Sequence, residues 1–73
     1  MTVYRQEEVG SCSFIDLLEE AVLRRSTVAV HLKDGSTFID RVQDVATDRG
    51  AEWAVFEEHE TVRTSEIASM TRG

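Results

Sequence analysis

Hydrophobic and polar residues alternate strictly through residues 27–35, which read TVAVHLKDG. Val28, Val30 and Leu32 fall on one side of this segment, and a period of two over such a length is typical of a half-buried β-strand. The segment ends in Asp34-Gly35, a strong hairpin signal because glycine adopts the positive φ that a tight turn needs. We therefore expect a strand that leads directly into a turn.

The residues before this strand follow a helical period instead. Ser11-Cys12-Ser13 is expected to open the helix, because Ser13-x-x-Asp16 resembles a capping box with Asp in place of the usual Glu. Ser26-Thr27 is expected to end it. One apolar stripe with spacing i, i+3, i+4, i+7 predicts a buried face. Its members are Phe14, Leu17, Leu18 and Ala21, widened by Ile15 and Val22.

The predicted helix carries acidic residues on the side opposite this stripe. Asp16, Glu19 and Glu20 are spaced i, i+3, i+4, which places the three carboxylates together. Glu20 and Arg24 form an i, i+4 pair, worth a few tenths of a kcal/mol. Such a face is either simply solvated or a binding surface for a basic partner.

A run of short strands is expected after the turn at Asp34-Gly35. In residues 36–48 the apolar positions change phase, from Phe38 and Val42 to Ile39 and Val45, which indicates a bulge or a sharp bend. The remaining signals are a turn at 48–50, an apolar strand over 51–57, a hairpin tip at 57–60, a strand at 61–64, a turn at 65–66 and a strand at 67–70.

These patterns predict a mostly β protein with one N-terminal α-helix. Five short antiparallel strands follow the helix and bend into a small sheet or barrel that the helix caps, which hides the strand edges. Residues 11–73 are expected to form a single domain. Residues 1–10 show no sustained pattern and are predicted to be a flexible N-terminal arm, with a short edge strand at Val3 and Tyr4 as the alternative.

Composition narrows the classes of function. The 73 residues include 14 Asp or Glu and 8 Lys or Arg, so the net charge is −6. Direct binding to nucleic acid usually needs a basic surface. We therefore expect no direct binding of nucleic acid by this acidic chain. An acidic surface suits a basic partner, or only keeps the protein soluble. We expect no membrane contact, because no apolar run approaches the ~20 residues of a transmembrane helix. We expect a cytoplasmic location, because the sequence shows no secretory signal pattern and its single cysteine cannot form an intrachain disulfide.

Catalytic and metal-binding patterns are weak. Cys12 lies near the predicted helix N-terminus, where a thiolate is favoured, but His31 and His59 lack the spacing of a catalytic family. The three residues also fall short of the four ligands that zinc normally takes. His59, in the acidic tip at 57–60, is either a pH-sensitive group or part of a solvated turn. Trp53 is expected in the core rather than as a platform for bases. We expect no enzymatic activity, no metal and no cofactor.

Several short segments occur in a fixed order along the chain. They are Cys12, Ile15-Asp16-Leu17-Leu18-Glu19-Glu20-Ala21, Leu32-Lys33-Asp34-Gly35, Asp44-Val45, Glu52-Trp53 and Arg63-Thr64-Ser65-Glu66-Ile67. Their order and spacing, from Cys12 to about Met70, resemble the Rof (YaeO) family of small bacterial modulators of Rho-dependent transcription termination. The sequence departs from the family pattern at Ile15, where the family has Tyr, and at Ser13-Phe14, where the family is often acidic.

The resemblance implies a small Sm-like fold, a bent five-stranded antiparallel sheet or barrel capped by the helix. It also implies a non-enzymatic inhibitor that binds the N-terminal RNA-binding domain of the hexameric transcription termination factor Rho, competes with RNA and causes antitermination. Asp16 and Glu19 match the acidic helix positions of the family and are the expected partner-binding residues, with Glu20 beside them. We expect a monomer. The alternatives are a Sm-like RNA-binding module and a small binding protein for another basic partner.

Overall fold

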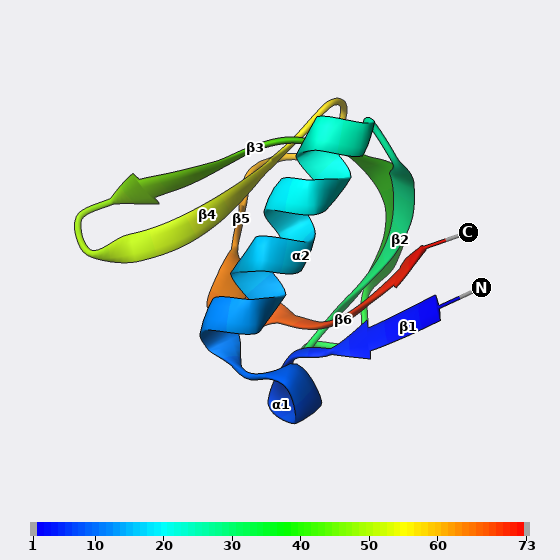
Figure 1. The fold of residues 1–73 in the computed structure, drawn as a ribbon, viewed down its shortest axis with the longest axis horizontal. Coiled ribbons are helices and arrows are strands. Elements are labelled where there is room, and N and C mark those ends of the chain that lie inside the picture. Colours follow the sequence, from blue (N-terminus) through cyan, green and yellow to red (C-terminus); the bar gives the residue numbers. More distant parts are fainter. Residues whose placement is uncertain (1, 73) are drawn as a thin grey trace.

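The strands and the long helix of the computed structural model, which describes residues 2–72, follow the hydrophobic patterns of the sequence (Figure 1). The elements in chain order are β1 (Thr2–Arg5), α1 (Gln6–Val9), α2 (Ser11–Arg24), β2 (Thr27–Leu32), β3 (Thr37–Asp48), β4 (Ala51–Phe56), β5 (Val62–Arg63), the 3₁₀-helix η1 (Thr64–Glu66) and β6 (Ile67–Arg72). The fold is mostly β, as predicted, and within residues 2–72 one α-helix, α2, is longer than a single turn.

All strand pairs are antiparallel, and the six strands form one open sheet in the order β1-β6-β2-β3-β4-β5. The prediction of five strands is wrong by one, because β1 precedes the helix and pairs with β6. Tyr4 lies opposite Met70 in this pair, so the edge strand that was the alternative for Val3 and Tyr4 is present. A single turn of helix, α1, follows it, where the local pattern had predicted only a loose arm.

Helix α2 begins at Ser11, with Gly10 as its N-cap and no side-chain hydrogen bond at the cap. The predicted capping box is therefore wrong, because Ser13 already lies inside the helix. At the other end Arg25 adopts a left-handed conformation with φ 54°. The backbone N–H of Ser26 then donates to the carbonyl oxygen of Ala21 at 3.0 Å, a Schellman-type ending that satisfies an otherwise free carbonyl.

Strand β3 is long and pairs with two different strands. Its residues 37–41 pair with β2, and its residues 42–48 pair with β4. The register shifts between Val42 and Asp44, which confirms the bulge predicted from the change of phase. Beyond the bulge, β3 and β4 form a hairpin that projects away from α2 (Figure 1). The turn at its tip has Arg49 at φ 52° and Gly50 at φ 76°, as a tight hairpin turn requires.

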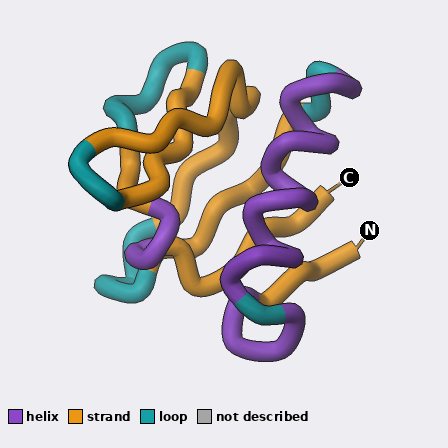
Figure 2. Tube along the Cα trace, turned by 60° about the vertical axis from the view of Figure 1, so that its left-hand side comes forward, coloured by secondary structure: helices purple, strands orange, loops and turns teal. Residues whose placement is uncertain are grey.

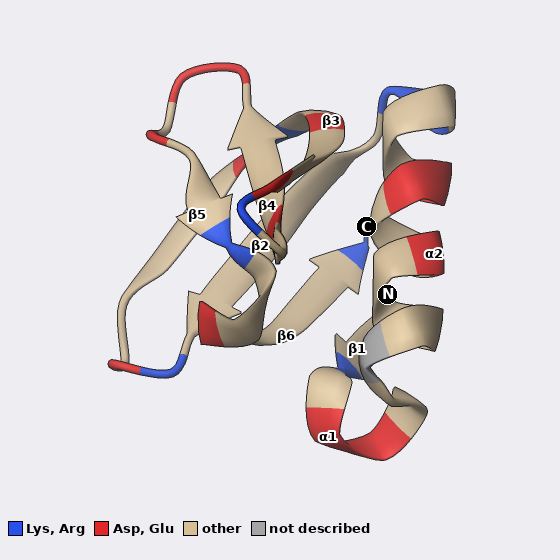
Figure 3. Cartoon of the chain, turned by 90° about the vertical axis from the view of Figure 1, so that its left-hand side faces the viewer, with Lys and Arg blue, Asp and Glu red and all other residues tan. Residues whose placement is uncertain are grey.

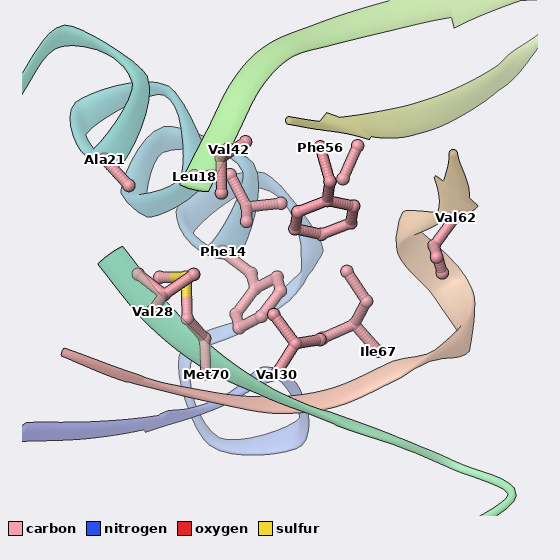
Figure 4. Packing of buried hydrophobic residues seen from close by; sticks show 11 residues of the cluster. Phe14, Leu18, Ala21, Val28, Val30, Val42, Phe56, Val62, Ile67 and Met70 are labelled. Atoms are coloured by element: carbon pink, nitrogen blue, oxygen red, sulfur yellow. The ribbon is translucent and has the colours of Figure 1, made fainter. Parts of the chain in front are cut away.

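The core lies between the inner face of the bent sheet and the apolar stripe of α2 (Figures 2 and 4). Phe14, Leu18 and Ala21 of the helix are fully buried. The sheet contributes Val28, Val30, Val42, Ala54, Phe56, Val62, Ile67 and Met70. Trp53 is an exception to the prediction, because Ala54 and Phe56 occupy the buried positions of β4 and alternation places Trp53, only half-buried, on the other face.

Candidate functional site

The predicted acidic face lies on the solvent side of α2. Asp16 and Glu19 are exposed, and Figure 3 shows acidic positions along α2. Leu23, which is 84% exposed, lies one turn beyond Glu19 on the same line. We call Asp16 and Glu19 the acidic stripe. Its position follows from the buried stripe, because a helix that inserts Phe14 and Leu18 into the core must turn these residues outward.

The two carboxylates of the acidic stripe make no ion pair within residues 2–72. The ion pairs found in residues 2–72 are Arg5–Glu8, Arg24–Glu20 and Arg72–Glu20. The acidic stripe takes part in none of them. Its charges are therefore available to a partner and are screened only by solvent and salt.

Glu20 has a different role from its neighbours. Its Oε1 lies 3.0 Å from Nε of Arg24, which confirms the predicted i, i+4 pair, and 3.6 Å from a guanidinium nitrogen of Arg72. Arg72 belongs to β6, so this contact ties the outer surface of α2 to the end of the sheet. Because two cations already surround Glu20, it offers less net negative charge to a partner than the acidic stripe does.

A shallow groove runs beside the acidic stripe. Its lining residues are Tyr4, Val9, Ser13, Asp16, Leu17 and Glu20. Tyr4, Val9 and Leu17 are half-buried and pack against the core, so the groove has an apolar floor and a carboxylate rim. Long basic side chains fit such a surface, since their methylene stems cover apolar atoms while the charged end reaches a carboxylate. The groove exists only because β1 and α1 lie against α2, which local sequence patterns did not reveal.

The residues considered for catalysis or metal binding, Cys12, His31 and His59, lie on three separate segments of the fold. Cys12 is free and exposed in the first turn of α2. His31 is exposed on the outward side of β2, and the ring of His59 stacks on Phe38 with centroids 3.7 Å apart. No group of three or more His, Cys, Asp or Glu side chains placed to hold a metal occurs among residues 2–72.

Asp40 is the polar residue that the sequence analysis overlooked. It is 8% exposed, and its Oδ2 accepts hydrogen bonds from the backbone N–H groups of Glu58 and His59 at 2.9 and 2.7 Å. Its Oδ1 accepts a third from the N–H of Arg41 at 2.8 Å. Burial works against ionisation of this carboxyl, but the three N–H donors and the nearby His59 outweigh it, so the pKa of Asp40 lies below its ordinary value.

Asp40 holds the loop between β4 and β5 rather than a ligand. The sequence did contain a signal for it, since Asp40 shares the inward side of β3 with Phe38 and Val42. A carboxylate at an inward position needs buried donors, and the turning backbone of residues 58 and 59 supplies them.

Comparison with known proteins found no match among protein-family models, curated proteins or solved structures. Within residues 2–72, none of the helices has the length and apolar character needed to cross a membrane.

Proposed function

We propose that this chain is a non-enzymatic inhibitor of the bacterial transcription termination factor Rho. The acidic stripe binds the N-terminal RNA-binding domain of Rho, competes with RNA for that site and so opposes termination. The proposal rests on the resemblance of residues 12–70 to the Rof (YaeO) family. The observation that carries it is the exposure of Asp16 and Glu19, two carboxylates without an ion pair in residues 2–72.

Electrostatics supports this mode of competition. A site that binds RNA must neutralise phosphates and is therefore basic, so a surface of carboxylates is complementary to it. The groove beside the acidic stripe adds apolar contact for the stems of Lys or Arg side chains. Glu20 borders the same groove, but its pairing with Arg24 and Arg72 makes it a minor contributor.

The Sm-like fold is part of the same proposal. Its support is the order of elements from α2 onward, one helix followed by five consecutive antiparallel strands. The last of these strands, β6, returns to lie beside the first, β2, and only η1 separates β5 from β6. We propose that this open sheet, which is bent at the bulge of β3, covered by α2 and extended at its edge by β1, is related to the Sm-like barrel.

A double charge reversal tests the site. We expect Asp16→Lys/Glu19→Lys to stay folded, because both side chains are exposed, and to bind Rho at least about tenfold more weakly, since two favourable contacts become repulsive. The matched control is Glu58→Lys/Glu60→Lys, which makes the same change of net charge at exposed loop residues far along the chain. Calorimetric titration into the isolated N-terminal domain of Rho, at two salt concentrations and with and without oligo(C) RNA, measures the binding.

The possible outcomes test two claims separately: that the acidic stripe is the binding site, and that Rho is the partner. Binding that weakens with salt, is displaced by RNA and is lost only in the Asp16→Lys/Glu19→Lys variant supports the proposal. Equal weakening in both variants would refute the acidic stripe as the site and leave only a general charge effect. Absence of binding at tens of micromolar by the folded wild-type protein would refute Rho as the partner and redirect the search to RNA or to another basic protein.

A further inference from the structure

The outer side of the sheet carries an uncovered apolar row across four strands. The register places Val3 opposite Thr71, Thr71 opposite Ala29, and Ala29 opposite Ile39. The next residue along β6, Met70, is fully buried in the core, so this row points to the opposite side. Ile39 is 74% exposed and Val3 is 51% exposed. Two branched aliphatic side chains thus stand in solvent on a surface that nothing in residues 2–72 covers.

Two arginines, Arg5 and Arg41, flank this row, and acidic residues are missing from it. On one side the register aligns Arg5, Ser69 and His31, and on the other side Arg41 lies opposite Thr27. No Asp or Glu occupies an outward position of β1, β2, β6 or residues 37–41 of β3. This is notable in a chain with 14 acidic residues and a net charge of −6. We call this surface, with Val3, Arg5, Ala29, His31, Ile39 and Arg41, the outer sheet face.

A recess extends the outer sheet face at the end near α1. Arg5, Lys33 and Ser69 line it together with Glu7. Arg5 also makes an exposed ion pair with Glu8 at 3.3 Å, which contributes little because both side chains are largely in water. A carboxylate entering the recess therefore meets two cations and a hydroxyl group, and it competes with Glu7 and Glu8 for them.

We propose that the outer sheet face is a docking surface for an acidic amphipathic protein segment. Aliphatic side chains of the segment cover Val3, Ala29 and Ile39, and its carboxylates pair with the flanking cations. Four strands spaced about 4.8 Å apart span about 14 Å, the length of between two and three turns of an α-helix. A protein segment fits better than a nucleic acid, because the face carries no Phe, Tyr or Trp side chain on which bases could stack.

This site is independent of the proposed binding to Rho. The acidic stripe lies on the solvent side of α2 and attracts cations, whereas the outer sheet face lies on the strands and attracts anions. Substitutions in one surface are expected to leave the other intact, so failure of either proposal does not decide the other.

The test uses the full chain and a labelled synthetic peptide of fourteen residues, with Leu at helical spacing i, i+3, i+4, i+7 and Glu at the other positions. Fluorescence anisotropy is expected to show binding that weakens with salt. Ile39→Asp and Arg41→Glu should each weaken it at least about tenfold, since each removes a contact and adds repulsion. Leu23→Asp is the matched control, because Leu23 is also highly exposed, at 84% against 74% for Ile39, but lies on α2. Circular dichroism checks that each variant is folded.

Four outcomes would overturn the proposal. They are absence of peptide binding at a hundred micromolar, equal binding of a peptide with Lys in place of every Glu, unchanged binding in both Ile39→Asp and Arg41→Glu, and equal loss in Leu23→Asp. Binding of a single-stranded RNA 15-mer that Ile39→Asp or Arg41→Glu abolishes would assign the face to nucleic acid instead. Salt-sensitive self-association lost in the same variants would assign it to a second copy of the chain.

Discussion

Replacing Asp40 measures how strongly one buried carboxylate holds the loop between β4 and β5. Two of its three hydrogen bonds reach residues 58 and 59, which are 18 and 19 positions away in the sequence. The third is to the N–H of Arg41, the next residue, and water can replace it. His59 also stacks on Phe38, so the loop and the start of β3 form one unit. Loss of the carboxylate should therefore loosen both.

The magnitude follows from the two loop bonds. A hydrogen bond to a charged group contributes about 1.5–3 kcal/mol, and leaving a buried donor unpaired costs a similar amount. Asp40→Ala leaves two N–H groups without their acceptor, so we expect the free energy of unfolding to fall by about 2–4 kcal/mol. Asp40→Asn keeps the shape but loses one acceptor oxygen and should cost about 1–2 kcal/mol. The total for a chain of this size is about 4–11 kcal/mol.

Urea unfolding followed by the fluorescence of the single tryptophan, Trp53, measures these changes. Asp44→Ala is the matched control, because Asp44 is exposed and its Oδ1 accepts only from the N–H of the adjacent Val45 at 2.8 Å. We expect this control to change stability by less than about 0.5 kcal/mol. If Asp40→Ala were no more destabilising than the control, the loop would not depend on these hydrogen bonds and the reasoning would be refuted.

The contribution of Asp40 also depends on pH with a defined sign. Its pKa in the folded protein is lowered, so its stabilisation is complete above the unfolded-state pKa of about 3.9 and is lost as pH falls through the folded-state value. The stability difference between wild type and Asp40→Asn should therefore be largest near neutral pH and shrink below about pH 4. A difference that grows on acidification would contradict the assigned hydrogen bonds.

Two further changes probe how the helices are anchored. Leu18→Ala removes a fully buried side chain of α2, and urea unfolding should show a loss of about 2–5 kcal/mol; a loss below about 1 kcal/mol would mean that the core collapses around the site. Gln6→Ala removes the hydrogen bonds from its Nε2 to the carbonyl oxygens of Thr64 at 3.0 Å and Ile67 at 2.6 Å. Hydrogen exchange should then accelerate in residues 2–9 while β2 stays protected, and unchanged exchange would show that β1 alone holds this segment.

The sequence predicted the elements whose signals are local. The alternation in β2, the apolar stripe of α2 and the glycine turns each depend on residues within a few positions, and the structure confirms them. The bulge in β3 also has a local signal. An extra residue in a strand shifts the inward-facing positions from even to odd numbers, so the apolar residues on the two sides of the bulge fall on different alternations. The exposure of Asp16 and Glu19 followed directly from the burial of Phe14 and Leu18.

Tertiary structure decided what local periodicity does not encode, namely which faces meet. Strand β1 is short, and its hydrophobic and polar residues show little alternation. It forms a strand because it pairs with the free edge of β6, close to the other end of the sequence. The same pairing brings Gln6 to the carbonyls of residues 64 and 67 and builds the groove beside the acidic stripe. Asp40 tolerates burial only because the loop after β4 supplies its donors, and the acid-free outer sheet face arises only when four separate strands align in register. Periodicity determines which face of a helix or strand is apolar and which is polar. Which element packs against each face depends on contacts between residues that are distant in the sequence and meet only on folding.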